Sequence, residues 1–567
     1  MVLYRADLRD IYFNLFDFLK IPKLYPQFNE QDITSIIEEF NKFMSQEVWP
    51  TRESGDQEGV RISNGIVTVP KCFHKLNQKF CENGWFKIGY PEDIGGVFAP
   101  YAVSLACTSL LNGANASYSI FVELTHGAMN IILKFGTQLM KQQWIPSMME
   151  GNIGGTMCLT EPGAGSDVGA LKTLATSMSD GRYKIKGTKL FISAGDNDLY
   201  KNIVHLVLAK TPGAPEGTKG ISLFVVPKLN ADGSANDVIC NKIEEKMGIH
   251  GSPTCELVFG GNDNCYGEIV GKECEGMSLM FVMMNEVRLF CGIQGESQAN
   301  MAFMLSEAYA RERIQFGKPI IELPDVKRML LKMRSKARGL RALNLYVGSL
   351  FDQKNLGAST EDLIALLTPI SKAYSTDEGF NVCVEAMQVH GGYGYIKDYA
   401  VEQFVRDSKI ATIYEGTNGI QAMDFLTRKV LKDQSKTLQE LFMKIHATIK
   451  KAKPYGWNKE LALLTLSMTK TKDILNYYAE KSTTNMEAVL GTSVDFLNYI
   501  SRIVVAWLLL EQAILAKEKM MIEQDGDGYL ASKITDYLFY SHQDLAHNAG
   551  LFQTICVFRE DYQHITV

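Results

Sequence analysis

The sequence lacks the patterns that identify several common kinds of functional site. It contains no Cys-x-x-Cys pair, no group of His and Cys residues at zinc-ligand spacing, no Walker loop and no Gly-x-Ser-x-Gly elbow. These absences exclude a zinc finger, a P-loop nucleotide hydrolase and a serine hydrolase with a nucleophile elbow. An Asp-Gly-Asp-Gly segment at 525–528 lacks the closing glutamate of a calcium loop, so it predicts a surface turn. We expect no metal site.

The chain also lacks an excess of positive charge. Its 58 Lys and Arg residues and 64 Asp and Glu residues give a net charge of −6, whereas nucleic-acid binding usually needs a basic patch or stripe. Eleven cysteines are few for 567 residues. Their odd number and scattered positions predict reduced thiols in the cytoplasm, not a disulfide framework. We therefore expect a cytoplasmic protein without a nucleic-acid partner.

Long hydrophobic runs are scarce as well. The first 20 residues mix acidic residues with arginine and do not form a secretory signal. The most apolar run, 503–510, is bounded by Arg502 and Glu511, which leaves it too short to cross a bilayer. It predicts a buried helix and no integral membrane segment.

What the chain does contain is length enough for three or four domains, since a domain averages about 150 residues. Over 1–155, apolar residues recur mostly at helical spacing, which predicts an all-helical N-terminal domain. The expected helices cover 8–20, 31–48, 69–83 and 102–151. Over 156–272, short β-branched stretches alternate with Gly, Asp, Asn and Pro clusters, which predicts a small antiparallel β domain. Its expected strands are 183–192, 203–209, 221–226 and 255–259.

Helical spacing returns at Gly276 and persists through most of the remaining chain. It predicts a helical bundle over 273–436 and a further helical domain over 437–567. The expected helices of the bundle cover 276–310, 324–354, 361–389, 398–409 and 420–432.

Four segments combine glycine or charge with a turn or a helix end. They are Thr-Glu-Pro-Gly-Ala-Gly-Ser-Asp (160–167), Ala-Arg-Glu-Arg-Ile-Gln-Phe-Gly-Lys-Pro (310–319), Gln-Val-His-Gly-Gly-Tyr-Gly-Tyr (388–395) and Ile-Tyr-Glu-Gly-Thr-Asn-Gly-Ile-Gln (413–421). Glycines of the first segment let backbone N–H groups approach a flat or phosphorylated ligand, and arginines of the second suit a pyrophosphate. Each segment alone also fits a structural role, as a turn or as a helix end whose basic residues compensate the dipole.

In this order and spacing, the four segments resemble the acyl-CoA dehydrogenase family. The N-terminal Asp-Leu-Arg-Asp at 7–10, the Phe-Ile-Ser-Ala-Gly-Asp at 191–196 and the long extension after 436 are similar to a large bacterial subgroup, which includes 3-methylmercaptopropionyl-CoA dehydrogenase-like proteins. The resemblance implies an α+β, mostly α, fold of the acyl-CoA dehydrogenase type. It would comprise a helical N-terminal domain, a central β domain, a C-terminal four-helix bundle and an additional C-terminal helical domain.

The resemblance also implies sites for FAD and for an acyl-CoA thioester. The residues that match FAD contacts of the family are Leu159, Thr160, Ser166, Phe191, Ser193, Arg313, Phe316, Gln388, Gly391, Gly392 and Thr417. Those from 313 to 392 would reach the FAD of a neighbouring subunit. Ser166 also matches the thioester region, and Asn285 with Arg288 matches a pair that holds CoA. Their spacing of three residues places this pair on one helix face.

Glu415 matches the catalytic base of the family. Removal of a proton α to a thioester needs a positioned base whose pKa burial has raised toward neutrality, and the β-hydride then passes to flavin N5. Some family members carry the base immediately before the CoA-contacting arginine, where this chain has Val287. Glu286 lies about 100° further around the helix. We therefore expect Glu415 to be the base.

Two positions depart from the family pattern. The family often has Ser-Gln after Glu-Gly-Thr, where this chain has Asn418 and Gly419. It often has a glutamine near the position of Leu323 and Pro324. Both departures concern contacts with FAD, and neither changes the base.

The resemblance predicts FAD-dependent α,β-dehydrogenation of an acyl-CoA to the trans-2-enoyl-CoA, with electrons passed to electron-transfer flavoprotein. It further implies a homodimer or homotetramer with a role in β-oxidation of fatty acids. One alternative is an acyl-CoA oxidase, which passes its electrons to dioxygen. Another is a flavin-containing DNA-associated relative without dehydrogenase activity, which would need a basic surface after residue 436.

Overall fold

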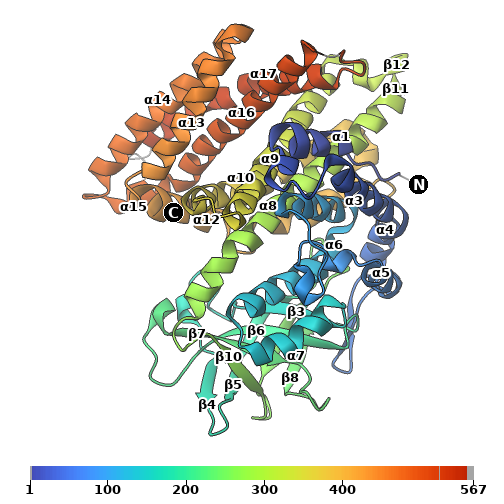
Figure 1. Cartoon of the computed structure of the whole chain (residues 1–567), viewed down its shortest axis with the longest axis vertical. Helices are drawn as coiled ribbons and strands as arrows, with labels where there is room; N and C mark the ends of the chain where they lie inside the picture. The colour runs from blue at the N-terminus through green and yellow to red at the C-terminus, as the bar shows by residue number, and fades with distance from the viewer. Residues whose placement is uncertain (1–2, 523, 559–567) are drawn as a thin grey trace. The chain divides into compact units, whose positions relative to one another are not determined.

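The computed structural model describes residues 3–522 and 524–558 of the chain, without the side chains of 281–283 and 558 (Figure 1). The chain forms two compact units. The bundle unit consists of the N-terminal segment up to Glu38, of Tyr101–Ser109 and of the chain from Arg288 onward. The sheet unit consists of Glu39–Pro100 and Leu110–Val287.

The sheet unit is built around an eight-stranded sheet. Its strands are β3 (Ile153–Cys158), β4 (Leu174–Ser177), β5 (Tyr183–Ser193), β6 (Asn202–Lys210), β7 (Ile221–Pro227), β8 (Val238–Ile243), β9 (Thr254–Phe259) and β10 (Tyr266–Val270). Because β10 pairs with both β7 and β5, the strands β10-β7-β6-β4-β5 close into a ring, which β9 and β8 extend. The four predicted strands correspond to β5, β6, β7 and β9. Inward-facing side chains, among them Phe224, Leu257 and Phe259, form the core.

The prediction of an antiparallel domain is wrong for β3, which runs parallel to β6 over all six of its residues. The prediction missed this strand because Gly154 and Gly155 interrupt its β-branched pattern. A Cβ on Gly154 would lie 2.3 Å from the Tyr200 ring, and one on Gly155 would lie 2.4 Å from the Cβ of Ala128 in α6 (Tyr101–Phe135). The two glycines therefore allow side chains and a helix to pack directly on the strand.

The prediction of an all-helical N-terminal domain is wrong at residues 61–68. A hairpin of β1 (Arg61–Ser63) and β2 (Ile66–Thr68) lies there. Asn64 and Gly65 form its turn with φ of 51° and 76°, the conformation that an Asn-Gly pair favours. That dipeptide between apolar residues was a signal available in the sequence.

The remaining elements of the sheet unit are helical. Its α-helices are the end of α3 (Glu30–Phe43), α4 (Trp49–Glu58), α5 (Lys71–Glu82), α6 from Leu110 onward, α7 (Gln138–Met149) and the part of α8 (Gly276–Glu312) up to Val287. The hydroxyl of Thr125 in α6 accepts a hydrogen bond of 3.1 Å from the backbone N–H of Gly155. This bond fixes α6 to β3.

The bundle unit contains the long helices that carry the predicted base and its neighbours. They are α8 from Arg288 onward (the whole helix is Gly276–Glu312), α9 (Pro324–Asn355), α10 (Glu361–His390), α11 (Val401–Ser408) and α12 (Asn418–Asp424), which continues as a π-helical turn, Phe425–Leu431. Helices α8 and α10 approach closely at Gly295 and Gly379, where a Cβ on either glycine would lie 2.3 Å from a backbone oxygen of the other helix. The two backbones are thus held in contact about two turns from Lys372.

The C-terminal helices form part of the same unit, and Figure 1 shows α13, α14, α16 and α17 in orange to red. They are α13 (Lys436–Ala452), α14 (Asn458–Lys481), α15 (Met486–Gly491), α16 (Ser493–Met520), α17 (Tyr529–Gln543) and α18 (Asn548–Gln553). By length and composition α16 passes as a membrane span, yet 83% of its most apolar window is buried in the protein. Its core position against α9 and α17 confirms the predicted buried helix.

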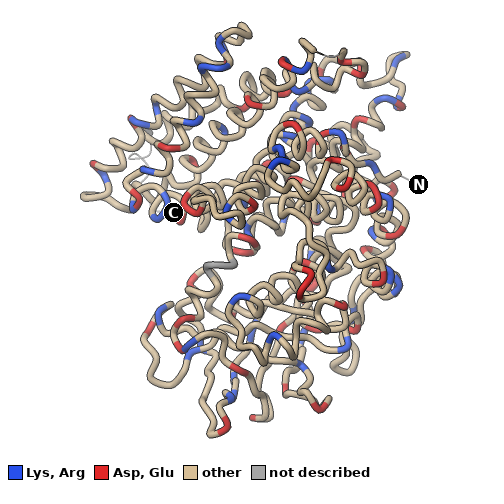
Figure 2. Tube along the Cα trace, viewed as in Figure 1, with Lys and Arg blue, Asp and Glu red and all other residues tan. Residues whose placement is uncertain are grey.

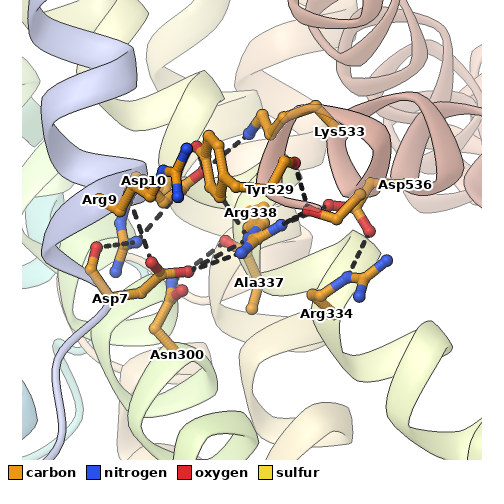
Figure 3. A network of polar contacts seen from close by, with 12 residues as sticks. Asp7, Arg9, Asp10, Asn300, Arg334, Ala337, Arg338, Tyr529, Lys533 and Asp536 are labelled. Atoms are coloured by element: carbon orange, nitrogen blue, oxygen red, sulfur yellow. Dashed lines mark hydrogen bonds and ion pairs between the residues drawn. The ribbon is translucent and has the colours of Figure 1, made fainter. Parts of the chain in front are cut away.

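A buried ionic network joins the N-terminal helix α1 (Leu8–Tyr12) to α9 and α17 (Figure 3). The carboxylate of Asp10 accepts from Lys533 at 2.7 Å and from Arg341 at 3.1 Å. Arg338 bridges Asp7 and Asp536, each at 3.0 Å. Because every charge in this network has an opposite partner, burial does not leave an unpaired ion. The C-terminal helices are therefore tied to the first helix of the chain.

Candidate active site

Glu415 lies in the turn between the 3-10 helix Lys409–Thr412 and α12. Its φ is 54°, and that of Gly416 is 86°. A left-handed conformation is uncommon for a residue with a Cβ and costs about 1–3 kcal/mol, and such residues cluster at active sites. Thr417 ends the turn as the N-cap of α12, since its hydroxyl accepts from the backbone N–H of Ile420 at 3.3 Å.

Side-chain donors hold both carbonyl groups of this turn. The amide of Gln421 donates to the carbonyl of Glu415 at 3.1 Å. The ammonium of Lys372, from α10, donates to the carbonyl of Gly416 at 2.8 Å. The backbone that carries the Glu415 side chain is therefore fixed from two helices.

The electrostatic surroundings of Glu415 suit a base. Burial raises the pKa of its carboxyl above the ordinary value, and the charges of Lys372 and Arg288 oppose that rise without cancelling it. Burial likewise lowers the pKa of Lys372 to about 8. A carboxylate whose pKa is raised binds an abstracted proton more readily than an ordinary one.

Arg288 lies beside the turn at the start of the bundle-unit part of α8. Its side chain is only 6% exposed and pairs with Asp424 of α12 at 3.2 Å. A Cβ added to Gly416 would lie 4.0 Å from its Nη2 atom. A guanidinium thus stands next to the Glu415 turn, held by a carboxylate of the following helix.

Three buried polar atoms around the turn have no hydrogen-bond partner among the described residues. They are Nε of Arg288, Nε2 of Gln294 and Oε1 of Gln421. Gln294 is linked to the turn because its Oε1 accepts a hydrogen bond from the hydroxyl of Tyr414. Buried polar groups are nearly always paired in a folded protein. Unpaired ones gathered at a single turn indicate a place for a polar ligand.

A concave region lies where α8 and α10 end, and Glu415 is not among the residues that line it. It is a pocket of about 440 Å³. Its lining contains four of the predicted cofactor residues, Arg313, Gln388, Gly391 and Gly392. Nothing lies within 4 Å of a Cβ placed on either glycine, so their backbone faces open space.

Aromatic rings frame this pocket. Tyr309 stacks on His390 with 4.2 Å between ring centroids, and the guanidinium of Arg313 lies 5.4 Å from the ring centre of Tyr393. Burial lowers the pKa of His390 below the ordinary value of a histidine. Phe316, also predicted to contact FAD, lies outside this lining, on the hairpin of Ile314–Gln315 and Lys318–Pro319. It is 88% exposed and has a φ of 51°.

The other predicted cofactor residues belong to the sheet unit. Leu159 and Thr160 follow β3, and the carbonyl of Thr160 accepts from the backbone N–H of Leu190 at 2.9 Å. This bond places Thr160 beside the end of β5, where Phe191 and Ser193 lie.

Phe191 presents its ring outward. It is 61% exposed, has a φ of 56°, and lies at an irregularity in the pairing of β5 with β9. Ser166 is exposed in the loop after Thr160, and Cβ atoms added to Gly163 or Gly165 would meet nothing within 4 Å. Asn285 is half-buried on α8. Of the predicted residues of this unit, Phe191 and Ser166 are therefore exposed, whereas Leu159, Thr160, Ser193 and Asn285 are half-buried.

Glu286 and the Leu323-Pro324 pair have contacts and positions of their own in the fold. Glu286, the discounted alternative to Glu415, accepts a hydrogen bond from Asn130 at 3.0 Å within the sheet unit. Leu323 is the N-cap of α9, and Pro324 its first residue, a position that proline favours because its missing N–H is not needed there.

Sequence reasoning missed four residues that contact the Glu415 turn or its neighbours, namely Lys372, Gln294, Gln421 and Asp424. Lys372 had a detectable signal, because it is a lone cation in the otherwise uncharged stretch 363–376. Such a lysine is buried only when something binds its ammonium. The amides had no comparable signal.

Models of known families match successive parts of the chain. They are the N-terminal domain of acyl-CoA dehydrogenases over residues 30–152, the middle domain over 156–261 and the C-terminal domain over 275–430. A model described as acetyl-CoA dehydrogenase C-terminal like matches 441–561.

Individual relatives match over nearly the whole length. The 3-methylmercaptopropionyl-CoA dehydrogenase of Ruegeria pomeroyi is 34% identical, with 96% of each chain covered. The broad-specificity linear acyl-CoA dehydrogenase FadE5 of Mycobacterium tuberculosis is 32% identical, with 92% of each covered.

A solved structure has the same fold. Caenorhabditis elegans ACDH-11, in complex with C11-CoA, superimposes with a TM-score of 0.82 at 20% identity, covering 100% of this chain and 97% of its own. The family models and the relatives confirm the resemblance inferred from the four segments. The chain therefore belongs to the acyl-CoA dehydrogenase family of oxidoreductases, in a form with an additional C-terminal helical region.

Proposed function

We propose that the chain is an FAD-dependent dehydrogenase of an acyl-CoA thioester, with Glu415 as the base. The observation that carries this proposal is the Glu415 turn itself. It combines a left-handed backbone, a carboxyl with a raised pKa and a neighbouring guanidinium. In the reaction the Glu415 carboxylate takes the α-proton of the thioester, and the C–H electron pair forms the α,β double bond as the β-hydride departs. When bound, FAD supplies the two-electron oxidant that accepts this hydride.

The residues of the chain fit FAD in two respects. The pocket at the ends of α8 and α10 offers open glycine backbone and the guanidinium of Arg313, and a guanidinium fork suits a pyrophosphate. In the sheet unit, Thr160 and Ser193 offer hydroxyl groups next to the outward ring of Phe191. We propose that Leu159, Ser166, Phe316, Gln388, Gly391, Gly392 and Thr417 complete these contacts.

Arg288 and Asn285 would bind the CoA part of the substrate. Arg288 is already held by Asp424, and its Nε still lacks a partner among the described residues. A buried guanidinium with a free donor favours a ligand with acceptor oxygens. Arg313 and Gln388 match residues that in this family reach the FAD of a neighbouring subunit, and both line the pocket. We therefore propose a homodimer or homotetramer.

We further propose electron-transfer flavoprotein as the electron acceptor, a cytoplasmic location and a place in acyl-CoA β-oxidation. The charges of the described residues support a function without nucleic acid, since Figure 2 shows acidic and basic residues interspersed along both units and along the helices after 436. A DNA-associated relative would need a basic surface on the helices after residue 436.

The proposal is tested by anaerobic titration of the purified FAD-loaded protein with a panel of CoA thioesters. The panel includes 3-methylmercaptopropionyl-CoA and straight-chain acyl-CoAs of increasing length, because the relatives named above differ in these substrates. We expect bleaching of the flavin absorbance with at least one thioester. Bleaching with none of them would contradict the proposal. Rapid reoxidation of the reduced flavin by dioxygen in place of electron-transfer flavoprotein would indicate an oxidase.

A further inference from the structure

Lys372 is a buried cation in the middle of α10 whose ammonium binds neutral acceptors. It donates to the carbonyl of Gly416 and to Oδ1 of Asn418, both at 2.8 Å. A buried ammonium is costly and is ordinarily paired with a carboxylate. Two neutral oxygens of a single turn compensate that cost poorly, so the position of Lys372 points to a function in that turn.

Asn418 completes the attachment of the turn to α10. Its Nδ2 atom donates to the carbonyl of Ala373 at 3.2 Å and to the hydroxyl of Thr376 at 3.0 Å, while its Oδ1 accepts from Lys372. An amide has an acceptor and two donors, whereas the serine common at this position in the family has a single donor. The departure from the family pattern therefore gives this chain an additional link between the turn and α10.

The attachment acts on the conformation of Glu415. The turn holds two successive residues at positive φ, and such a conformation persists only where its surroundings determine it. Gln421 binds the carbonyl of Glu415, which belongs to the peptide that joins Glu415 to Gly416, and Lys372 binds the carbonyl of Gly416, which belongs to the next peptide. We propose, on the basis of the proposed function, that Lys372 and Asn418 are positioning residues that lock the Glu415 turn onto α10 and so orient the catalytic carboxylate.

Lys372 also contributes charge. Lys372 on α10 and Arg288 on α8 are the cations that face the Glu415 carboxyl, and both lower its pKa against the larger effect of burial. Lys372 is itself faced by Cys291 and Asp377 as well as by Glu415. Removing the ammonium therefore raises the pKa of Glu415, and the rate of proton abstraction then reaches its plateau at a higher pH.

The test compares Lys372→Met, Lys372→Arg and Asn418→Ala in the FAD-loaded protein. Hydrogen–deuterium exchange of the peptide spanning 413–421 is measured without substrate, and flavin reduction by acyl-CoA is measured across pH. We expect faster exchange in 413–421 for Lys372→Met and Asn418→Ala. We also expect reduction slowed by about 10- to 100-fold, because a small misplacement of a catalytic group has an effect of that size, with acyl-CoA binding little changed.

The pH profile separates orientation from charge. Its acidic limb should move to higher pH in Lys372→Met and remain in place in Lys372→Arg and Asn418→Ala. Lys332→Met is the matched control, since Lys332 pairs with Glu385 at 2.9 Å, away from the turn. It should leave both exchange in 413–421 and reduction unchanged.

Each outcome of these experiments either supports or overturns the proposal that Lys372 and Asn418 lock the Glu415 turn. Exchange in 413–421 at the wild-type rate in both Lys372→Met and Asn418→Ala would overturn it, as would unchanged reduction rates and pH profiles. If Lys372→Met does not fold, Asn418→Ala carries the test because it removes no charge. If wild-type protein is not reduced by any thioester, the proposed function fails, and the exchange measurement still decides whether the two residues lock the turn.

Discussion

A glutamate in the left-handed region, between an aromatic residue and a glycine, is the smallest feature on which the account depends. Its φ of 54° is retained because Gln421 and Lys372 bind the carbonyls of its turn. At this scale the sequence identified the predicted base and its neighbouring arginine but did not identify the residues that hold the turn in place. Glu415 and Arg288 were recognisable by motif, but Gln294 and Gln421 contact the turn through amides that no local pattern marks.

The raised pKa of Glu415 predicts the pH dependence of flavin reduction. Burial raises this pKa more than Lys372 and Arg288 lower it, and only the ionised carboxylate accepts a proton. The rate of anaerobic reduction should therefore rise with pH, with a midpoint above that of an ordinary glutamate, about 4.3. Stopped-flow reduction over a range of pH measures it. A rate that is flat from pH 4.5 upward would contradict the assigned environment.

At the scale of elements, the network of α1, α9 and α17 explains how the C-terminal helices are attached (Figure 3). Burial alone would raise the pKa of Asp10, but Lys533, Arg338 and Arg341 together lower it below the ordinary value. A carboxylate with a depressed pKa stabilises the fold above its unfolded pKa of about 4, and this contribution is lost as the pH falls toward its folded pKa.

Asp10→Asn should lower the free energy of unfolding by about 3–5 kcal/mol. The reason is that the buried cations Lys533 and Arg341 lose the negative charge that both of them contact. Asp17→Asn is the matched control in the same N-terminal segment. Asp17 pairs with Lys519 at 2.7 Å at a partly exposed position, where a pair contributes about 0–1 kcal/mol. Urea unfolding at pH 7 measures both. Equal losses for the two variants would show that the buried network contributes no more than a surface pair.

The long helices were predicted well from the sequence. Short strands whose residues are determined by tertiary packing or by a tight turn were predicted less well. The long helices α8, α9 and α10 begin and end within two residues of their predicted ranges. β3 was missed because it contains glycines. These glycines allow α6 to pack closely on the strand, and this packing is visible only in the tertiary structure. The hairpin at 61–68 was missed although its Asn-Gly turn was visible in the sequence.

At the scale of the whole molecule, composition and motif order were enough to place the chain in its family. They could not supply the contacts that support the site, because these join segments far apart in sequence. Lys372 lies 44 residues from Gly416, and Asp10 lies 523 residues from Lys533. Contacts at such separation depend on the folded structure and leave no local pattern.

The central claim is that Glu415 is the base, and comparing Glu415→Gln with the wild-type protein tests it most directly. Both proteins, loaded with FAD, are mixed anaerobically with the thioester that bleaches the wild type, and Glu286→Gln serves as the control. We expect Glu415→Gln to retain FAD and to bind acyl-CoA but to leave the flavin oxidised, while Glu286→Gln is reduced like the wild type. Reduction of Glu415→Gln at the wild-type rate would contradict the account.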